Sequence, residues 1–320
     1  VHTGGSGESD AMIRHADVAL YSAKEAGRNR YKVFEDEMVQ EMEDTLGLEQ
    51  DLRLGMGRGE FSVHYQSEID LNTHAMVGVE ALLRWQSPTR GPVPPSRFIP
   101  LAEATGLIHP LGEFVLREAC QQTAQWRRAG ILPERFVTWV NVSGRQLSDG
   151  GVSALVQSIL EEAGLPANFL GLEVTETAIV AQGVAGDRAS AELHELHDRG
   201  VRIAIDDFGT GFSSIGHLRR FPVDLIKVDR SFVQGVGHNA KDTAITTNLA
   251  SLAHALGLRA VAEGIETDEQ LSSVSELGCD LAQGYLFAHP VPADEMSNVL
   301  ATMAVLPDLP DLIQPETALA

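Results

Sequence analysis

Residues 201–211 form the stretch VRIAIDDFGTG. Its first five residues form a short apolar run that is typical of a buried strand. Asp206 and Asp207 stand where that strand ends, and Gly209 and Gly211 in the following loop allow backbone conformations closed to other residues. Paired carboxylates at a strand end can reach two metal ions, and the glycine loop beside them could act as a lid. An ordinary strand-to-helix turn is the alternative interpretation.

The same unit, a short β-rich run followed by a helical pattern, recurs along most of the chain. Strand-like runs occupy 61–69, 76–85, 136–142, 169–174, 201–205, 225–228, 260–262 and 281–287, and the clearest helical patterns occupy 111–129, 152–163, 184–199, 242–256 and 268–277. Alternating strands and helices predict a mostly parallel sheet covered by helices. Eight strands over about 250 residues favour a closed, TIM-like (β/α)8 barrel of the α/β class over an open sheet.

The first two strand-like runs differ from the others in how they are joined. Only residues 70–75 separate them, whereas a parallel crossover needs about a dozen residues or more. We therefore expect the first strand to run antiparallel to the second.

The ends of the chain have a different composition. Residues 10–26 have apolar side chains at helical spacing, and 31–34 have a short strand pattern. These elements are too few to bury a core, so we interpret residues 1–34 as a fragment of another domain and 35–60 as a linker helix. The barrel is expected at 61–304, and residues 305–320, rich in Pro and Asp, are expected to be a disordered tail.

The charge and the cysteine content limit the possible partners. A net charge of −21 disfavours binding to a DNA or RNA duplex, and an anionic substrate would need bound cations to invert the local field. Cys120 and Cys279 are too few for a disulfide framework or a thiolate metal site. With no run of about eighteen apolar residues and no visible signal peptide, a cytoplasmic location is expected. The chain begins at Val1, so we treat it as a piece of a longer protein, which could carry a membrane anchor elsewhere.

Polar residues stand at the ends of the predicted strands. They are Gln66 and Glu68 on the first strand, then Glu80, Asn141, Glu173, Asp206 and Asp207, Lys227, Glu263 and Gln283. In a barrel of this kind the carboxyl ends of the strands face one mouth. Each residue taken alone could be a helix cap or part of a loop salt bridge. Together they would place at least five carboxylates in one cleft, which requires cations, and oxygen ligands of this kind select hard ions such as Mg²⁺ or Mn²⁺.

The order of these motifs resembles the EAL-domain cyclic-di-GMP phosphodiesterases. The signature triplet is Glu80-Ala81-Leu82, and the resemblance extends from about residue 61 to 303. It includes FIPLAE at 98–103, NVS at 141–143, EVTE at 173–176, DDFGTG at 206–211, KVD at 227–229, AEGIE at 262–266 and QGYLF at 283–287. Residues 16–31 resemble the end of a GGDEF domain, the usual tandem partner, although the Gly-Gly-Asp-Glu-Phe site itself is absent.

The resemblance implies hydrolysis of cyclic-di-GMP to linear pGpG with two Mg²⁺ or Mn²⁺ ions and in-line attack by water. It implies roles for eleven residues. The metal ligands would be Glu80, which is also counted as catalytic, with Asn141, Glu173, Asp206 and Asp207. Glu263 would be a further ligand or the general base, and Lys227 would position or help to activate the attacking water. The substrate contacts would be Arg84, Gln66 and Gln283, the last of them beside that water and the metals, and Glu176 would anchor the loop after Asp207. Ser67 stands where the family usually has Pro, which puts the shape of this rim in question. The resemblance also implies a homodimer, and GGDEF and sensor domains upstream.

Two other functions stay open. The chain could be a silent module that binds cyclic-di-GMP and signals to a partner, or a scaffold that only mediates assembly. Silent members of such families usually lack some ligands, and here every expected ligand is present.

Overall fold

The computed structural model describes residues 12–13, 15–20, 23, 31–133, 135–180, 184–210, 218 and 220–305. The chain divides into two compact units, one made of Val1–Glu60 with Gln86–Thr105 and the other of Phe61–Trp85 with Gly106–Ala320. Much of the expected GGDEF-like fragment, the glycine loop from residue 211 and the expected tail after residue 305 lie outside the described residues. The proposed domain boundaries therefore stay a prediction.

The first unit is built around the helix α2 (Glu37–Arg58), with β3 (Gly91–Val93) and α3 (Pro95–Thr105). Arg90 pairs with two aspartates of α2: its Nε donates to Asp51 Oδ2 at 2.7 Å, and its Nη1 donates to Asp44. Residues 31–34 are not a strand. The expectation there was wrong because a β-like pattern needs a neighbouring strand, and within the described residues none pairs with it.

The second unit is a closed barrel of eight strands. They are β1 (Phe61–Asp70), β2 (Met76–Ser87), β4 (Val137–Asn141), β5 (Leu170–Thr175), β6 (Arg202–Phe208), β7 (Leu225–Val228), β8 (Arg259–Glu263) and β9 (Leu281–Gln283). Neighbouring strands from β2 round to β9 pair in parallel. The strand β1 closes the ring and is antiparallel to both β2 and β9. The predicted barrel with an antiparallel first strand is confirmed.

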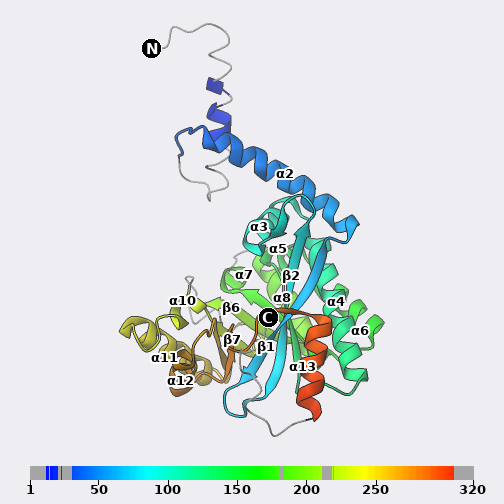
Figure 1. The fold of residues 1–320 in the computed structure, drawn as a ribbon, viewed down its shortest axis with the longest axis vertical. Coiled ribbons are helices and arrows are strands. Elements are labelled where there is room, and N and C mark those ends of the chain that lie inside the picture. Colours follow the sequence, from blue (N-terminus) through cyan, green and yellow to red (C-terminus); the bar gives the residue numbers. More distant parts are fainter. Residues whose placement is uncertain are drawn as a thin grey trace, which may run out of the picture. The chain divides into compact units, whose positions relative to one another are not determined.

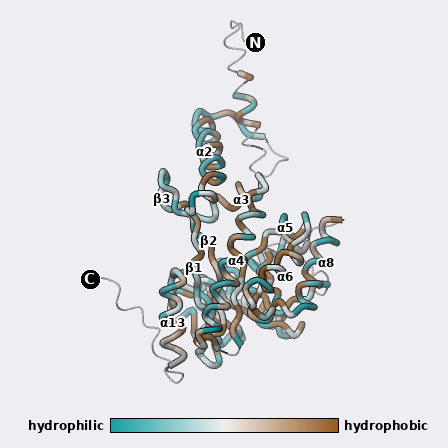
Figure 2. Tube along the Cα trace, turned by 90° about the vertical axis from the view of Figure 1, so that its right-hand side faces the viewer, coloured by the Kyte–Doolittle hydropathy of each residue, from teal (hydrophilic) through white to brown (hydrophobic). Residues whose placement is uncertain are grey.

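Helices surround these strands (Figure 1). They are α4 (Ile108–Arg128), α5 (Gly144–Asp149), α6 (Val152–Ala163), α7 (Glu176–Val180), α8 (Val184–Asp198), α10 (Arg230–Val233), α11 (Ala240–Ala255), α12 (Asp268–Glu276) and α13 (Ala293–Val305), with a 3₁₀ turn at Ala167–Phe169 and a short strand β10 (Val291–Pro292) beside β1. Hydrophobic and hydrophilic residues alternate along α4, α6 and α8 (Figure 2). Their apolar stripes pack on the outer face of the sheet in one continuous core.

The last barrel strand is shorter than the apolar run predicted at 281–287. It ends at Gln283 because the chain turns at Gly284, which lies against the backbone of Ile265. A Cβ at position 284 would stand 2.1 Å from the Ile265 carbonyl oxygen, so only glycine fits this close approach.

Cys120 and Cys279 are both buried and unpaired, and burial raises the pKa of each thiol to about 12. This agrees with their interpretation as small core side chains. Among the described residues, no helix combines the length and the apolar character needed to cross a membrane.

Candidate active site

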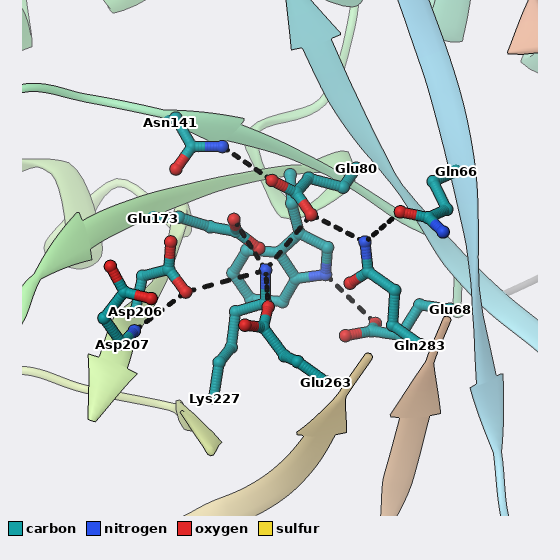
Figure 3. A network of polar contacts seen from close by, with 11 residues as sticks. Gln66, Glu68, Glu80, Asn141, Glu173, Asp206, Asp207, Lys227, Glu263 and Gln283 are labelled. Atoms are coloured by element: carbon teal, nitrogen blue, oxygen red, sulfur yellow. Dashed lines mark hydrogen bonds and ion pairs between the residues drawn. The ribbon is translucent and has the colours of Figure 1, made fainter. Parts of the chain in front are cut away.

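Side chains fill the inside of the barrel in layers, because alternate residues of a strand face the same side of the sheet. The upper layer lies at the carboxyl ends of the parallel strands and contains the predicted site residues Gln66, Glu80, Asn141, Glu173, Asp206, Lys227, Glu263 and Gln283 (Figure 3). The barrel thus brings together residues that are separated by up to 217 positions in the sequence.

Lys227 is at the centre of this layer and is fully buried. Its Nζ lies 2.6 Å from Glu263 Oε1, 2.9 Å from Glu173 Oε2, 3.2 Å from Glu80 Oε2 and 3.9 Å from Asp206 Oδ1. One ammonium group therefore serves four carboxylates. Because the negative charges outnumber the positive one, the layer has a strong local excess of negative charge.

Glu80 is held by several donors at once. Asn141 Nδ2 donates to its Oε1 at 2.7 Å, and Gln283 Nε2 donates to its Oε2 at 2.6 Å. Gln283 Nε2 also lies 3.2 Å from Gln66 Oε1, and the Gln66 amide donates to the carbonyl of Ala288 at 3.1 Å. The structure thus connects four predicted site residues through one hydrogen-bond network.

The end of β6 has an unusual backbone. Asp207 has a φ of 54°, the left-handed region that is rare for residues other than glycine. The register between β6 and β7 shifts here, between Ile205 and Phe208. Glu176 Oε2 accepts a hydrogen bond from the Gly209 backbone N–H at 2.9 Å. This turn orients the two adjacent aspartates, and Glu176 of α7 (Glu176–Val180) holds it in place through the Gly209 N–H.

Burial and mutual repulsion change the ionisation of the layer. Burial, with Asp206 and Glu80 nearby, raises the pKa of Glu263 to about 8, although Lys227 opposes the shift. Burial and the neighbouring Asp206 raise the pKa of Asp207 to about 6. For Lys227, burial is outweighed by Glu173, Glu263 and Glu80, so its pKa is raised and it stays charged. Without further cations, the layer takes up protons near neutral pH.

The donor set fits a hard divalent cation. Asp206, Asp207 and Glu263 each offer a carboxylate oxygen, and these oxygens lie within 4.8 Å of one another. Glu173 Oε1 is buried and has no hydrogen-bond partner among the described residues. A buried carboxylate oxygen without a partner is costly unless a cation binds it. Carboxylate and amide oxygens are the ligands that such ions prefer.

Arg84 lies on the same face of β2 as Glu80, four residues further along. It is about half-buried, and its Nη1 donates to the carbonyl of Leu83 at 3.0 Å. Burial lowers the pKa of its guanidinium, while Tyr285 and Glu80 oppose the shift. Arg84 thus places a positive charge near the acidic layer, with Tyr285 beside it.

Sequence reasoning did not assign a role to two residues beneath this layer. Glu68, noted only as a polar residue of the first strand, is buried at 3% exposure, and Trp139 was missed. Trp139 Nε1 donates to Glu68 Oε2 at 3.1 Å. The signal that could have found Trp139 is its spacing, two residues before Asn141 on the same strand.

Known proteins resemble this chain over most of its length. The family described as "EAL domain" matches residues 49–290. The bifunctional diguanylate cyclase/cyclic di-GMP phosphodiesterase MucR of Pseudomonas aeruginosa is 39% identical over 292 residues, which cover 90% of this chain and 42% of that protein. The cyclic di-GMP phosphodiesterase PdeR of Escherichia coli K12 is 37% identical over 286 residues, covering 89% of this chain and 42% of that protein.

Solved structures show the same fold. The structure described as the PaMucR phosphodiesterase in complex with c-di-GMP has a TM-score of 0.74 and 39% identity, and the match covers 78% of this chain and 99% of that one. The chain spans less than half the length of the curated relatives named above. Phosphodiesterases of the matched family generally depend on divalent metal ions, and the oxygen cluster at the strand ends offers such a site. The barrel, the motifs and these matches show that this chain belongs to the EAL domain family.

Proposed function

We propose that this chain is a metal-dependent phosphodiesterase that hydrolyses cyclic-di-GMP to linear pGpG. The observation that carries the proposal is the acidic layer at the barrel mouth, where four carboxylates surround Lys227 and a buried Glu173 oxygen has no partner among the described residues. An apolar or randomly charged mouth would not need cations. The names of the relatives support the choice of substrate.

The proposed metal ions are Mg²⁺ or Mn²⁺, two per site. Their ligands would be Glu80, Asn141, Glu173, Asp206 and Asp207. When bound, such ions lower the pKa of a coordinated water and stabilise the charge that develops on the leaving oxygen. They would also neutralise the layer, which allows an anionic substrate to approach a chain of net charge −21.

The reaction breaks one P–O3′ bond of the cyclic substrate. Water attacks the phosphorus in line, the water oxygen becomes part of a 5′-phosphate, and the 3′ oxygen leaves and takes up a proton from solvent. We assign Glu263 as the base that accepts the water proton, because burial raises its pKa to about 8, close to neutral pH. Lys227, whose Nζ lies 2.6 Å from Glu263 Oε1, orients this carboxylate and the attacking water.

Residues around the layer would bind the substrate and hold the site. Arg84 suits a phosphate oxygen because a guanidinium is a permanently charged donor with a fork geometry. Gln66 and Gln283 are hydrogen-bonded to each other and lie next to Glu80. Glu176 would fix the loop after Asp207 through the Gly209 N–H.

Chromatography of the reaction products tests the proposal. Wild-type protein with Mg²⁺ or Mn²⁺ should convert cyclic-di-GMP into pGpG, and a chelator should stop the reaction. Glu80→Ala should reduce kcat by about 100-fold or more, because it removes a proposed metal ligand. Glu276→Ala is the matched control, because this exposed carboxylate of α12 lies outside the acidic layer. Wild-type rates for Glu80→Ala would contradict the ligand assignment.

A silent binding module is the second candidate. It predicts binding of cyclic-di-GMP in saturating metal without any pGpG. The complete set of acidic residues in the layer favours the enzyme, because binding alone does not require a base of raised pKa beside a lysine. A homodimer and upstream GGDEF and sensor domains remain predictions for the longer protein. Sedimentation of this chain checks the first of them.

A further inference from the structure

Beneath the acidic layer, the barrel interior contains a second layer that is almost entirely apolar. It is formed by one inward-facing residue from each barrel strand: Glu68, Gly78, Trp139, Gly171, Ala204, Leu225, Val261 and Leu281. On the seven strands from β2 to β9, each member stands two residues before a residue of the acidic layer. Trp139, Ala204, Leu225, Val261 and Leu281 form one buried cluster. This layer is the floor of the candidate active site.

The Trp139 indole is the large side chain in this floor, and its neighbours leave room for it. A Cβ at Gly171 would lie 2.1 Å from the ring carbon Cε3, and a Cβ at Gly78 would lie 3.5 Å from the indole nitrogen. Trp139 is opposite Glu80 in the register of β4 and β2 and opposite Gly171 in that of β4 and β5. The ring therefore lies against β2 and β5, the strands that supply two proposed metal ligands, Glu80 and Glu173.

Glu68 is the acidic member of the floor. It is 3% exposed, its Oε2 accepts the Trp139 indole N–H at 3.1 Å, and its Oε1 has no hydrogen-bond partner among the described residues. Burial raises the pKa of Glu68 to about 6, against the opposing effects of Lys227 and Trp139. A buried carboxylate costs free energy, whereas an apolar side chain would fill the layer without that penalty. A buried indole N–H requires an acceptor, and Glu68 provides it.

We propose that Glu68 is a positioning residue of the phosphodiesterase, because its hydrogen bond to the indole fixes the Trp139 ring as the floor beneath Glu80 and Lys227. This inference rests on the proposed function. Glu68 and Trp139 lie one layer below the proposed ligands, so they act through the geometry of that layer and not by touching substrate. Loss of the hydrogen bond should therefore change kcat and metal affinity more than the KM for cyclic-di-GMP.

Two disruptive variants and one conservative variant test the role. Glu68→Ala removes the acceptor, Trp139→Phe removes the donor, and Glu68→Gln keeps an acceptor oxygen. Glu68→Ala and Trp139→Phe should each lower kcat and weaken Mn²⁺ binding by about 10- to 100-fold, as is usual for residues that support metal ligands. Glu68→Gln should stay within about threefold of wild type. The double variant should be no worse than the poorer single one, because both changes remove the same bond.

A matched control separates positioning from general stability. Thr123 on α4 shares a buried hydrogen bond of 2.6 Å with Thr138, which neighbours Trp139 on β4 but faces outwards. Thr123→Val should lower the melting temperature of the metal-free protein and leave kcat and Mn²⁺ affinity unchanged. Calorimetric titration with Mn²⁺ and thermal melts are run on every variant, together with steady-state kinetics.

Three results would overturn the inference. These are wild-type kcat and Mn²⁺ affinity in Glu68→Ala, equal losses in Glu68→Gln and Glu68→Ala, or additive losses in the double variant. A wild-type protein that makes no pGpG would instead contradict the proposed function. In that case the Mn²⁺ affinities alone decide the role of Glu68.

Discussion

At the scale of single residues, Lys227 supplies the positive charge that stabilises the carboxylates of the metal-free site. It is fully buried and lies within 4 Å of four carboxylates. Lys227→Met would leave these charges without their partner, so we expect the metal-free protein to lose about 3–5 kcal/mol of unfolding free energy. Urea unfolding at pH 7.5 measures this loss. Lys241→Met, at an exposed position of α11, should change stability by less than about 0.5 kcal/mol. A loss of equal size in both variants would contradict the central role of Lys227.

Also at the residue scale, the raised pKa values predict how metal binding depends on pH. A carboxyl group with a raised pKa binds more protons in the folded than in the unfolded protein, so the metal-free fold loses stability as pH rises from the ordinary carboxyl range to about 8, the pKa of Glu263. Metal ions compete with these protons. Mn²⁺ affinity should therefore increase with pH across the range from about 6, the pKa of Asp207, to about 8, the pKa of Glu263. Calorimetric titration at several pH values in buffers of different ionisation enthalpy gives both the affinity and the protons released. An affinity that stays constant over this range would show that the layer holds no such protons.

At the scale of elements, the end of β6 and the start of α7 act together. Glu176 lies at the start of α7 and accepts the Gly209 N–H at 2.9 Å, and Asp207 adopts its left-handed φ two residues before that glycine. Glu176→Ala should lower kcat and Mn²⁺ affinity by about tenfold, because the turn that directs Asp207 loses its anchor. Glu176→Gln keeps an acceptor oxygen, so its kcat and its Mn²⁺ affinity should fall less. If both variants keep wild-type metal affinity, Glu176 does not position this turn.

The strands also show which features of the structure could be predicted from the sequence. The short link at 70–75 predicted the antiparallel β1, and the strand ends predicted the residues of the acidic layer, because parallel strands share one mouth. The apolar run at 281–287 did not reveal that β9 ends at Gln283, since the turn depends on contact with Ile265. The Glu68–Trp139 bond was not predicted either. It joins β1 to β4, the two strands on either side of β2, and only the register and tilt of the closed sheet bring the two side chains together.

At the scale of the whole molecule, metal binding should stabilise the folded chain. A cation that binds the folded state at 100 times its Kd adds about 2.7 kcal/mol to the unfolding free energy. Saturating Mn²⁺ should therefore raise the melting temperature of wild-type protein and of Glu276→Ala alike, and a chelator should reverse the change. Asp206→Asn should show a smaller rise, because Asp206 is a proposed ligand within the oxygen cluster. An equal rise in Asp206→Asn would mean that the stabilising ions bind elsewhere on this acidic chain.

Anomalous diffraction from crystals grown with Mn²⁺ tests most directly whether the strand ends form one metal centre. We expect strong anomalous peaks inside the barrel mouth, next to the carboxylates of Asp206 and Asp207, with Glu80, Asn141 and Glu173 as the other ligands and Glu263 beside them. Peaks found only on the outer surface, or no peak inside the mouth at neutral pH, would contradict a metal centre there.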